Sequence, residues 1–349
     1  MLIILNKNIM ITSNLNKTLF FILFATAIFI FFGCNSNSKE KIDVYPIIFS
    51  FSKDENIDIY KLTNIDDQIV QLTTDKSNET NPVWSPDKKR IAYLSNKNDI
   101  PNLWIMDSNG KSKQEVLESN VEVEKFYWSP DSKKIAAETN KNGNSSIIII
   151  NLNENSKEIL NLPYQNVDIG GWSPDGKWII YSIQDNKHVG LKRKNLYGVD
   201  EFTITEQNDY LPKWSPNGKW IAFFRKQSFG NYELIYTNID GSKSEILLDN
   251  LNEKIDYDWS DDSKNIIFSK EDDKSKMNEI FKVEIKNKSI KQLTHNRVND
   301  TNPKWNKKNS NIIFSSENGN IIDLYSMLID GSEQKRITKN SEKFLTADW

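Results

Sequence analysis

The sequence is poor in the residues from which metal centres and nucleophilic active sites are most often built. It contains two histidines and one cysteine among 349 residues. A lone cysteine cannot form an intrachain disulfide. The histidines, His188 and His295, lie about a hundred residues apart and do not suggest a centre of clustered imidazole ligands. We expect both in or beside surface loops. A G-x-S-x-G motif is also missing, which excludes a serine peptidase built on that nucleophile turn.

A dominant charge of one sign is likewise absent. The chain has 45 basic and 48 acidic residues and a formal net charge of −3, so no strong basic field exists to attract nucleic acid. Hydrophobic residues make up 38% of the chain and aromatic residues 11%, which is too much apolar surface for a disordered protein. We therefore expect a folded, monomeric protein without a nucleic-acid partner.

The chain also lacks a hydrophobic run long enough for a typical membrane-spanning helix. Its longest apolar run, Leu19 to Phe32, has fourteen residues and follows Lys7 and Lys17. This length and charge pattern are typical of the hydrophobic region of an export signal. Met10 is an alternative start that changes nothing downstream. The polar stretch after the run, Asn35 to Lys41, has the composition of a tether.

The four residues that end at Cys34 read Phe-Phe-Gly-Cys and resemble the lipobox of bacterial lipoproteins, whose cysteine is acylated. The glycine fits that pattern, whereas an aliphatic residue is usual in place of the first phenylalanine. The resemblance implies a signal peptide over residues 1–33 and a lipidated tether over residues 34–44. Several acyl chains would hold the protein durably at a membrane surface. An uncleaved N-terminal anchor with an incidental cysteine is the alternative.

The expected location is the bacterial cell envelope. Asn35, the residue after the cysteine, is not the aspartate that is linked to retention at the inner membrane in enteric bacteria. The resemblance to lipoproteins therefore favours the periplasmic face of the outer membrane, or the cell surface.

Tryptophan marks an internal repeat in the rest of the chain. Seven tryptophans recur at intervals of 42 to 46 residues: Trp84, Trp128, Trp172, Trp214, Trp259, Trp305 and Trp349. The first four open the motif W-S-P-[DN], and worn versions follow Trp259 and Trp305. An apolar segment begins seven residues after each of the first six, at Ile91, Ile135, Ile179, Ile221, Ile266 and Ile312. The spacing predicts one repeated unit of about 44 residues.

Each unit reads as four antiparallel strands, which we name a to d. Strand a ends at the tryptophan, and Ser-Pro-Asp-Gly makes a tight turn into the β-branched and aromatic strand b. A loop of variable length leads to strand c, as at Asn102 to Met106. A second tight turn, such as Asp107 to Gly110, leads to a strand d such as Gln292 to Thr294. Four strands in about 44 residues predict a propeller blade.

The distribution of strands predicts how the ring closes. Before Trp84 the sequence contains strands b, c and d but no strand a, and its last segment, Phe344 to Trp349, contains a strand a alone. We therefore expect an all-β fold over residues 45–349. It is a seven-bladed β-propeller in which the C-terminal strand completes blade 1. Closure removes the free sheet edge that an open array would expose.

The W-S-P-D-G-K-x-I-A-F stretch, the N-x-D-G turn and the closing L-T resemble the repeat of the TolB-like β-propeller family, over roughly residues 45–349. The resemblance implies a propeller of the kind found in bacterial surface and periplasmic proteins. TolB itself has six blades and an additional N-terminal α/β domain, for which this chain has no room between Cys34 and its first strand. Its partner, the peptidoglycan-associated lipoprotein, is therefore not carried over, because fold does not fix function.

The repeated tryptophans are expected to pack between blades rather than to contact a ligand. In a propeller the a–b and c–d turns share one face, and the b–c loops share the other face with the connections between blades. The turns here are tight, whereas the b–c loops vary, so we place the functional face on their side, beside the channel entrance. These loops are Asn96 to Asn102, Thr139 to Ser146, Gln184 to His188, Arg225 to Asn231, Lys270 to Asn278 and Ser316 to Asn320.

Acidic residues a few positions before the tryptophans are the candidate partner-binding residues at the channel mouth: Glu79, Glu124, Asp168, Asp209, Asp256 and Asp300. Such a ring of carboxylates could bind a cation or a basic peptide segment. The alternative is that they cap the strand-entry turns. No dedicated calcium loop of the Asp-x-Asp-x-Asp-Gly type is present.

Two further groups of residues have weaker functional interpretations. A basic cluster in the fourth blade is expected on a solvated outer face, with an anion-docking patch as the alternative: Lys187, His188, Lys192, Arg193 and Lys194. Aromatic residues near the loop face could stack on a sugar or a peptide but are expected to pack under the loops: Phe126, Tyr127, Tyr210 and Tyr257.

These features together predict a lipid-anchored binding or scaffold protein that engages an envelope protein or peptide through a propeller face. We expect no cofactor, no metal and no enzymatic activity. Oligogalacturonate lyases have similar repeats but use clustered histidine ligands. A propeller that binds carbohydrate or another envelope ligand is an alternative. A carboxylate enzyme at the channel mouth is a further one, because any such channel brings carboxylates together.

Overall fold

The computed structural model describes residues 46–53, 56–63, 68–141, 144–185, 187–306, 311–338 and 343–349. The chain divides into two units, Met1–Asp43 and Val44–Trp349, and every described residue belongs to the second. The expected signal peptide, Cys34 and tether therefore lie outside the described residues. Within the described ranges, no helix is both long and apolar enough to cross a membrane.

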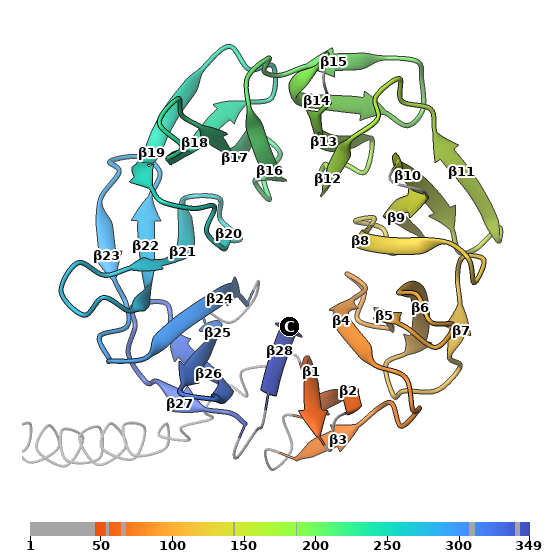
Figure 1. Cartoon of the computed structure of the whole chain (residues 1–349), viewed down its shortest axis with the longest axis horizontal. Helices are drawn as coiled ribbons and strands as arrows, with labels where there is room; N and C mark the ends of the chain where they lie inside the picture. Colours follow the sequence, from red (N-terminus) through yellow and green to blue (C-terminus); the bar gives the residue numbers. More distant parts are fainter. Residues whose placement is uncertain are drawn as a thin grey trace, which may run out of the picture. The chain divides into compact units, whose positions relative to one another are not determined.

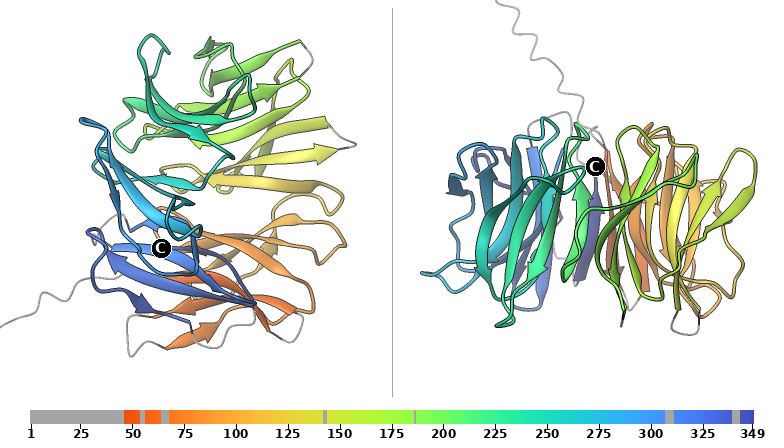
Figure 2. Two further views of the ribbon diagram at one scale, coloured as in Figure 1. Left: turned by 60° about the vertical axis from the view of Figure 1, so that its left-hand side comes forward. Right: turned by 90° about the horizontal axis from the view of Figure 1, so that it is seen from above.

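The unit Val44–Trp349 is a ring of seven four-stranded antiparallel sheets, which confirms the predicted all-β propeller (Figure 1). In every blade strand a lies innermost and strand d outermost. Seen from the side, the strands run between the two faces of the ring (Figure 2). We call the face with the a–b and c–d turns the turn face, and the face with the b–c loops the loop face.

The first four blades follow in chain order, each given from strand a to strand d. Blade 1 contains β28 (Lys343–Asp348), β1 (Ile47–Lys53), β2 (Asn56–Leu62) and β3 (Ile69–Gln71). Blade 2 contains β4 (Glu79–Trp84), β5 (Arg90–Ser95), β6 (Asn102–Asp107) and β7 (Gln114–Glu115). Blade 3 contains β8 (Glu122–Trp128), β9 (Lys134–Lys141), β10 (Asn144–Asn151) and β11 (Ser156–Leu160). Blade 4 contains β12 (Val167–Trp172), β13 (Trp178–Gln184), β14 (Val189–Asn195) and β15 (Glu201–Thr203).

The remaining three blades repeat the same order. Blade 5 contains β16 (Asp209–Trp214), β17 (Trp220–Lys226), β18 (Tyr232–Asn238) and β19 (Ser244–Leu251). Blade 6 contains β20 (Tyr257–Trp259), β21 (Asn265–Glu271), β22 (Asn278–Glu284) and β23 (Ile290–Gln292). Blade 7 contains β24 (Asn299–Trp305), β25 (Asn311–Asn318), β26 (Ile321–Leu328) and β27 (Lys335–Arg336).

Blade 1 closes the ring with strands from the two ends of the unit, as predicted. The last strand, β28, pairs antiparallel with β1, so that Ile48 lies opposite Asp348 and Ser50 opposite Thr346. The hydroxyls of Ser50 and Thr346 form a hydrogen bond of 2.9 Å. Because β1 pairs on its other side with β2, both edges of β1 are satisfied.

The Ser-Pro-Asp motif forms the a–b turn through a repeated set of side-chain bonds. In blade 2 the Ser85 hydroxyl donates to Asp87 Oδ1 at 2.7 Å and accepts from the Arg90 amide at 3.0 Å. The Asp87 carboxylate also accepts from the Lys89 amide. The same serine-to-aspartate or serine-to-asparagine bond is present in blades 3, 4, 5 and 6. Serine and aspartate in this motif are therefore used by the turn itself.

The Leu-Thr pair after strand d has an equally local role in blades 1 and 6. The Thr73 hydroxyl accepts the Ile59 amide at 2.8 Å and donates to the buried Asp58 carboxylate at 3.0 Å. In blade 6 the Thr294 hydroxyl does the same between the Ile280 amide and Glu279. The threonine thereby ties the end of strand d to strand c inside the sheet.

The hydrophobic core is divided among the blade interfaces. The isoleucines seven residues after the repeated tryptophans are fully buried, and the repeated tryptophans outside blade 5 are at most 8% exposed. Successive clusters join one blade to the next; in one of them Phe224 of blade 5 packs edge-on against Tyr257 of blade 6. Contacts between neighbouring blades therefore hold the ring together, as in other repeat folds.

Candidate functional site

The innermost strands carry one side chain per blade directly before the tryptophan, and we call these seven residues the channel wall. They are Val83, Tyr127, Gly171, Lys213, Asp258, Lys304 and Asp348. From blade 5 through blade 1 the wall alternates between lysine and aspartate. This alternation was not recognised from the sequence, although the constant offset from tryptophan makes it readable there.

Charged channel-wall residues satisfy the inner backbone edge of the following blade. Asp258 Oδ2 accepts the amide of Trp305 at 3.0 Å, and Asp348 Oδ2 accepts the amide of Trp84 at 2.8 Å. Lys213 Nζ donates to the carbonyl of Tyr257 at 2.5 Å. An innermost strand has no neighbour on the channel side, so its backbone groups need such partners. The channel wall is thus ordered before any ligand arrives.

Lys213 is a charged channel-wall residue whose pKa is clearly shifted. Burial and the nearby Lys304 ammonium lower its pKa to about 8, although Asp258 and Asp256 oppose the change. The amine therefore titrates just above neutral pH.

The repeated tryptophans hold adjacent blades together, as the sequence predicted. The indole N–H of Trp128 donates to the carbonyl of Val83 at 3.2 Å, and that of Trp172 donates to the carbonyl of Tyr127 at 3.0 Å. Each acceptor is the channel-wall residue of the preceding blade. Indole burial and this bond together give the tryptophan a structural role.

Three of the six candidate acids are buried inside their blades. Glu79, Asp209 and Asp300 are at most 1% exposed, and each lies in the first two residues of strand a, opposite a polar residue of strand b. Nε and Nη2 of Arg225 donate to the two carboxylate oxygens of Asp209 at 2.8 and 2.9 Å. A partner at the channel mouth cannot reach these carboxylates while the blades are closed.

Hydroxyl donors hold the other two buried acids. Ser77 and Ser95 donate to Glu79 Oε1 at 2.6 and 3.0 Å, and Ser316 donates to Asp300 Oδ1 at 2.6 Å. Burial raises the pKa of both carboxyls, although these hydroxyls oppose the shift. The expectation that all six acids line the channel mouth is therefore wrong for Glu79 and Asp300. Both are buried in the blade interior, where serine hydroxyls donate hydrogen bonds to them.

The distance from the tryptophan separates the buried acids from the others. Each buried acid lies five residues before the tryptophan, and a β-bulge follows it in strand a. Asn81, Leu211 and Asn302 have φ angles of 51°, 50° and 53° at these bulges. A bulge adds a residue and shifts which side chains face each side of a strand. Strands β8 and β12 have bulges as well, and Val123 and Val167, five residues before their tryptophans, are likewise buried. Glu124 and Asp168 lie four residues before their tryptophans, and Asp256 three, so these acids do not occupy the buried position.

The other three acids remain at the channel. Glu124 and Asp256 are exposed, and Glu124 accepts a bond from the Asn140 amide group at 2.9 Å. Asp168 forms an ion pair of 2.5 Å with Lys125 of the preceding blade. The channel mouth therefore presents mixed charge rather than a ring of carboxylates.

Another buried acid near the channel was missed in the sequence. Glu138, in strand b of blade 3, is 3% exposed, and its Oε2 accepts the amide of Ile169 in blade 4 at 2.8 Å. Burial raises the pKa of Glu138 to about 7, and the nearby Asp168 adds to the shift. Its position within the apolar Ile-Ala-Ala-Glu segment was the available signal.

Several residues of the basic cluster of blade 4 are held by contacts with their neighbours. Arg193 stacks over the rings of Trp178 and Phe202 at 4.4 and 5.0 Å, and Lys192 donates to the Thr203 hydroxyl at 2.6 Å. His188 is exposed and lies 3.2 Å from the Asp185 carboxylate. These contacts agree with a solvated outer face.

The remaining histidine and the four aromatic candidates have different surroundings. His295 is exposed, as expected for a histidine in a loop. Phe126 and Tyr257 are buried, as expected for packing under the loops. Tyr127 and Tyr210 are partly exposed. Among the described residues, no three histidine, cysteine or acidic side chains are grouped so that they could hold a metal ion.

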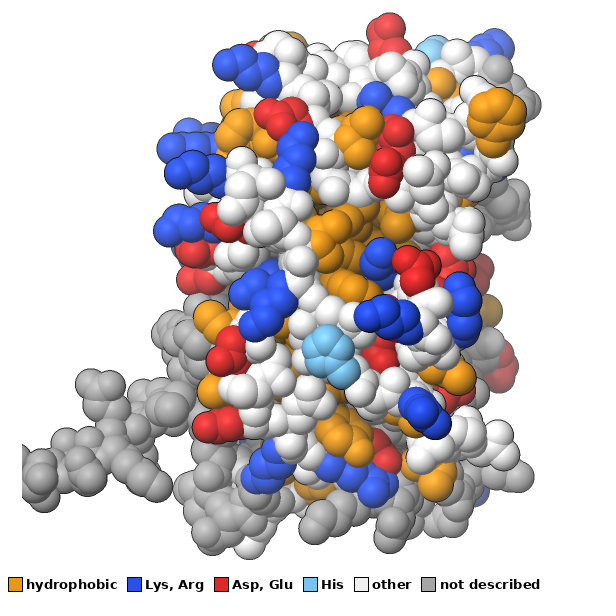
Figure 3. Space-filling view, turned by 90° about the vertical axis from the view of Figure 1, so that its left-hand side faces the viewer, with side chains coloured by type: hydrophobic (Ala, Val, Ile, Leu, Met, Phe, Trp, Pro, Cys, Tyr) orange, Lys and Arg blue, Asp and Glu red, His pale blue; other side chains and the backbone are white. Residues whose placement is uncertain are grey.

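The outer rim carries charges of both signs. On the side of β19 and β23, basic and acidic side chains are interspersed, with hydrophobic side chains between them (Figure 3). An example is the exposed pair of Lys288 and Glu245 at 3.0 Å. The rim therefore resembles an ordinary soluble surface, and we place no site there.

The loop face carries a cavity of about 380 Å³ within blade 7. Strands β25 and β26 supply Phe314, Ser316 and Asp323, and β27 supplies Arg336. Arg336 pairs with Asp323, whose other oxygen accepts the Thr338 hydroxyl at 2.9 Å. This polar cavity lies beside the b–c loop of blade 7, on the face that we expected to be functional from loop variation.

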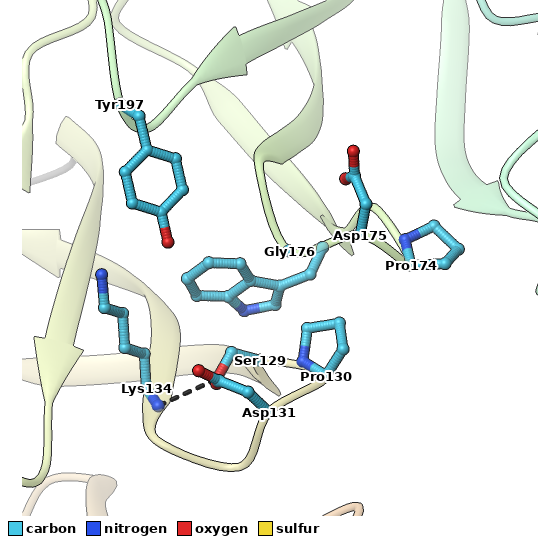
Figure 4. A pocket seen from close by; sticks show the side chains of 9 residues that line it. Ser129, Pro130, Asp131, Lys134, Pro174, Asp175, Gly176 and Tyr197 are labelled. Carbon is cyan, nitrogen blue, oxygen red and sulfur yellow. Dashed lines mark hydrogen bonds between the residues drawn. The ribbon is translucent and has the colours of Figure 1, made fainter.

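A second cavity, of about 300 Å³, opens on the turn face between blades 3 and 4, and we call it the blade 3–4 pocket. Figure 4 shows the Tyr197 ring pointing toward the turns that carry Pro130, Asp131 and Asp175. The complete lining is Ser129, Pro130, Asp131, Lys134, Trp172, Pro174, Asp175, Gly176 and Tyr197. The sequence predicted no site on this face.

Comparison with known proteins agrees with this geometry. The pattern of the TolB beta propeller domain family matches residues 28–192, 96–260 and 212–349, which together cover every described blade. No curated protein sequence matches the chain.

Several solved structures share the fold at low sequence identity. TolB from Acinetobacter baumannii is 15% identical with a TM-score of 0.55; the match covers 86% of this chain and 65% of the TolB chain, so this chain spans about two thirds of its length. Oligogalacturonate lyase from Vibrio parahaemolyticus is 15% identical with a TM-score of 0.66, covering 80% of this chain and 85% of the lyase. The propeller domain of the trilobed protease from Pyrococcus furiosus is 14% identical with a TM-score of 0.63. The match covers 86% of this chain and 96% of the protease domain.

Proposed function

The chain belongs to the TolB β-propeller domain family, and on that premise we propose that it is a binding protein of the bacterial cell envelope. It holds a polypeptide segment of a protein partner at the channel mouth. The propeller is a rigid frame, and recognition in such folds resides in the loops and the channel that the frame presents.

The observation that carries this proposal is the ordered, mixed charge of the channel. Lysines and aspartates alternate along the channel wall from Lys213 to Asp348, and Glu124 and Asp256 are exposed at the mouth. A polypeptide carries both charges and backbone amides, so it can complement such a surface at several points. Complementary charges of this kind contribute mainly to specificity and to the rate of association.

Anchoring through Cys34 is the second part of the proposal. It is supported by the Phe-Phe-Gly-Cys motif after a short apolar run, and it would place the propeller at the outer membrane or cell surface. Replacing Cys34 with alanine should yield an exported, folded protein that leaves the membrane fraction. Unchanged membrane retention of this variant would refute the lipid anchor.

We further propose that the protein is not an enzyme. The likeness to the lyase and the protease supports only the fold, and the described residues contain no group of histidine, cysteine or acidic side chains arranged for a metal ion. Binding without chemistry then requires only the rigid frame and the charged channel.

The channel proposal is tested by crosslinking pull-down from intact cells. One variant carries Glu124→Gln, Asp168→Asn and Asp256→Asn, which removes the three accessible carboxylates and leaves the buried Glu79, Asp209 and Asp300 intact.

The matched control removes three exposed carboxylates away from the channel: Glu154→Gln, Glu158→Gln and Asp249→Asn. A protein captured by the wild type and the control, but lost with the channel variant, is the expected result. Equal capture by all three proteins would show that the channel mouth is not the binding site. Capture of a saccharide in place of a protein would favour the carbohydrate alternative.

A further inference from the structure

The blade 3–4 pocket exists because two positions in the repeat differ at this interface. The residue six after the tryptophan is Lys134 in blade 3, where blade 2 has Arg90 and blades 4 and 5 have Trp178 and Trp220. Arg90 lies over the Trp128 ring of the next blade, whereas Trp178 and Trp220 pack edge-on against Phe202 and Tyr236 of their own blades. Lysine carries only a flexible chain and a small head group in place of the Arg90 guanidinium.

The fourth residue after the tryptophan borders the same space from the following blade. It is Ser132 in blade 3 and Ser263 in blade 6, and each hydroxyl accepts a backbone amide of the preceding blade at 3.0 Å. In blade 4 the position is Gly176, and a Cβ atom built there would meet no atom closer than 3.8 Å. At the interface between blades 3 and 4, blade 3 contributes Lys134 and blade 4 contributes Gly176. A cavity of about 300 Å³ lies between them.

The neighbouring interface shows which group fits such a space. The guanidinium carbon of Arg90 lies 5.2 Å from the centre of the Trp128 ring, and its Nη2 donates to the carbonyl of Ser132. The Arg90 charge also helps to lower the pKa of Asp87, for which burial is the opposing influence. An indole, a turn carbonyl and a turn carboxylate thus form a receptor for a guanidinium group.

The blade 3–4 pocket contains the same elements without the guanidinium. Trp172 replaces Trp128, Gly176 replaces Ser132, and Asp131 and Asp175 are the turn carboxylates. Lys134 lies against a different ring, with its Nζ 5.4 Å from the centre of Tyr197. The lining itself contains two carboxylates and one ammonium. Lys133 lies near Asp131, and Lys177 and Arg193 lie near Asp175, outside the lining.

The rim of the pocket has the exposed apolar residues expected at a protein contact. Tyr197 is 72% exposed, and Val199 in the same c–d turn is 90% exposed. Such residues beside a polar cavity favour a polypeptide partner, whose neighbouring side chains would cover them.

We propose that the blade 3–4 pocket binds an arginine side chain of a partner polypeptide. The guanidinium occupies the space that Arg90 fills at the preceding interface, with the Trp172 and Tyr197 rings beside it and Asp131 and Asp175 as its counter-charges. The site lies on the turn face, so it is independent of the proposed binding at the channel mouth on the loop face.

The test uses acetylated and amidated Gly-Arg-Gly, with Gly-Lys-Gly and Gly-citrulline-Gly as comparisons. Binding is followed by ¹⁹F NMR of the propeller labelled with 3-fluorotyrosine, in which the Tyr197 signal is assigned with the Tyr197→Phe variant. The arginine peptide should bind at least about tenfold more tightly than the neutral citrulline peptide, since a charge-assisted hydrogen bond is lost in the latter. Its binding should weaken as salt is raised.

The decisive variant is Lys134→Arg with Gly176→Ser, which turns the pocket into a copy of the blade 2–3 interface. Ser132 and Ser263 already adopt φ angles of 62° and 59° at this position, close to the 70° of Gly176, so the serine is compatible with the turn. This variant should lose arginine-peptide binding by at least about tenfold because its own guanidinium fills the site.

Lys219→Arg is the matched control, because it makes the same exchange at an exposed turn position outside the pocket. It should bind the arginine peptide as the wild type does. Equal binding of the arginine and citrulline peptides, undiminished binding by the double variant, or no shift of the Tyr197 signal with any peptide would each overturn the proposal.

Discussion

Blade 3 meets its two neighbours through interfaces that share a backbone and differ in what fills them. Toward blade 2, Arg90 covers the Trp128 ring and closes the turn face. Toward blade 4, Lys134 leaves a cavity beside Trp172. The comparison shows that a repeat fold tolerates a void at one interface, because each blade contacts only its neighbours and the other interfaces keep the ring closed.

The two interfaces also differ near the loop face. Glu138 of blade 3 is buried against Ile169 of blade 4, whereas the corresponding residue of blade 2 is Leu94, packed in an apolar cluster with residues of blade 3. The blade 2–3 interface is thus apolar at one end and filled by arginine at the other. The blade 3–4 interface has a titratable group at one end and a cavity at the other, which makes it the more polar and adaptable of the two.

The largest expected effect comes from removing the two indoles separately. Trp128→Ala and Trp172→Ala should each lower the free energy of unfolding by about 3–5 kcal/mol. The loss should be larger for Trp128, because Arg90 then loses the ring beneath it, whereas Trp172 already borders a cavity. Urea denaturation followed by circular dichroism measures both values, and a larger loss for Trp172→Ala would contradict the comparison.

The second effect is a pH dependence specific to the blade 3–4 interface. The pKa of Glu138 is about 7 in the folded protein, against 4.5 for an ordinary glutamate. Between these pH values the unfolded chain releases a proton that the folded protein keeps, so stability falls as the pH rises through this window. Above pH 7, burial of the ionised Glu138 lowers the free energy of unfolding by about 3 kcal/mol.

Glu138→Gln should remove this dependence, because the amide oxygen can still accept the bond from Ile169. Asp168, Lys125 and Glu124 face the same carboxyl and are left unchanged. The stability advantage of the variant over the wild type should therefore grow by about 3 kcal/mol from pH 4 to pH 8. Urea titrations at several pH values test this, and parallel stability curves for the two proteins would refute it.

A smaller effect is expected when the filled interface is opened. Arg90→Lys should lower the free energy of unfolding by about 1–2 kcal/mol, because the guanidinium contact with Trp128 and the bond to Ser132 are lost. A crystal structure of the variant should show a new cavity between blades 2 and 3. Unchanged stability together with an unchanged interior would mean that arginine is not what closes this interface.

The smallest effect is the reverse exchange. Lys134→Arg should raise the free energy of unfolding by about 0.5–1 kcal/mol, because the new guanidinium can lie over Trp172 and bind the Gly176 carbonyl. Differential scanning calorimetry should show a correspondingly higher Tm. A lower Tm would show that the cavity cannot hold a guanidinium, which would also count against the proposed arginine site.

The architecture could be predicted because its signals are local and repeated. The interval between tryptophans is nearly constant, and an apolar segment begins seven residues after each of the first six. Blade number, strand order and closure by β28 were predicted from these signals and are confirmed. The structural role of the tryptophans followed as well, since a large indole at a constant position in every unit suits packing between blades.

The candidate site could be predicted only in part, because burial at the channel depends on single-residue offsets. Glu79 lies five residues before its tryptophan and is buried, whereas Glu124 lies four residues before its tryptophan and is exposed, although both strands contain a β-bulge. Side chains alternate between the faces of a strand, so a one-residue shift reverses their environment. The mixed charge of the channel mouth emerged for this reason only from the coordinates.

The sequence by itself determined a closed seven-bladed ring and its repeated turns. The turns rest on hydrogen bonds within one unit of the repeat, and the closure could be read from the strand a that is missing before Trp84 and present at the C-terminal end. Only the tertiary structure decided which acids face the channel and where a cavity opens. Those outcomes depend on pairs such as Lys134 and Gly176, which belong to different blades and meet only when the ring has formed.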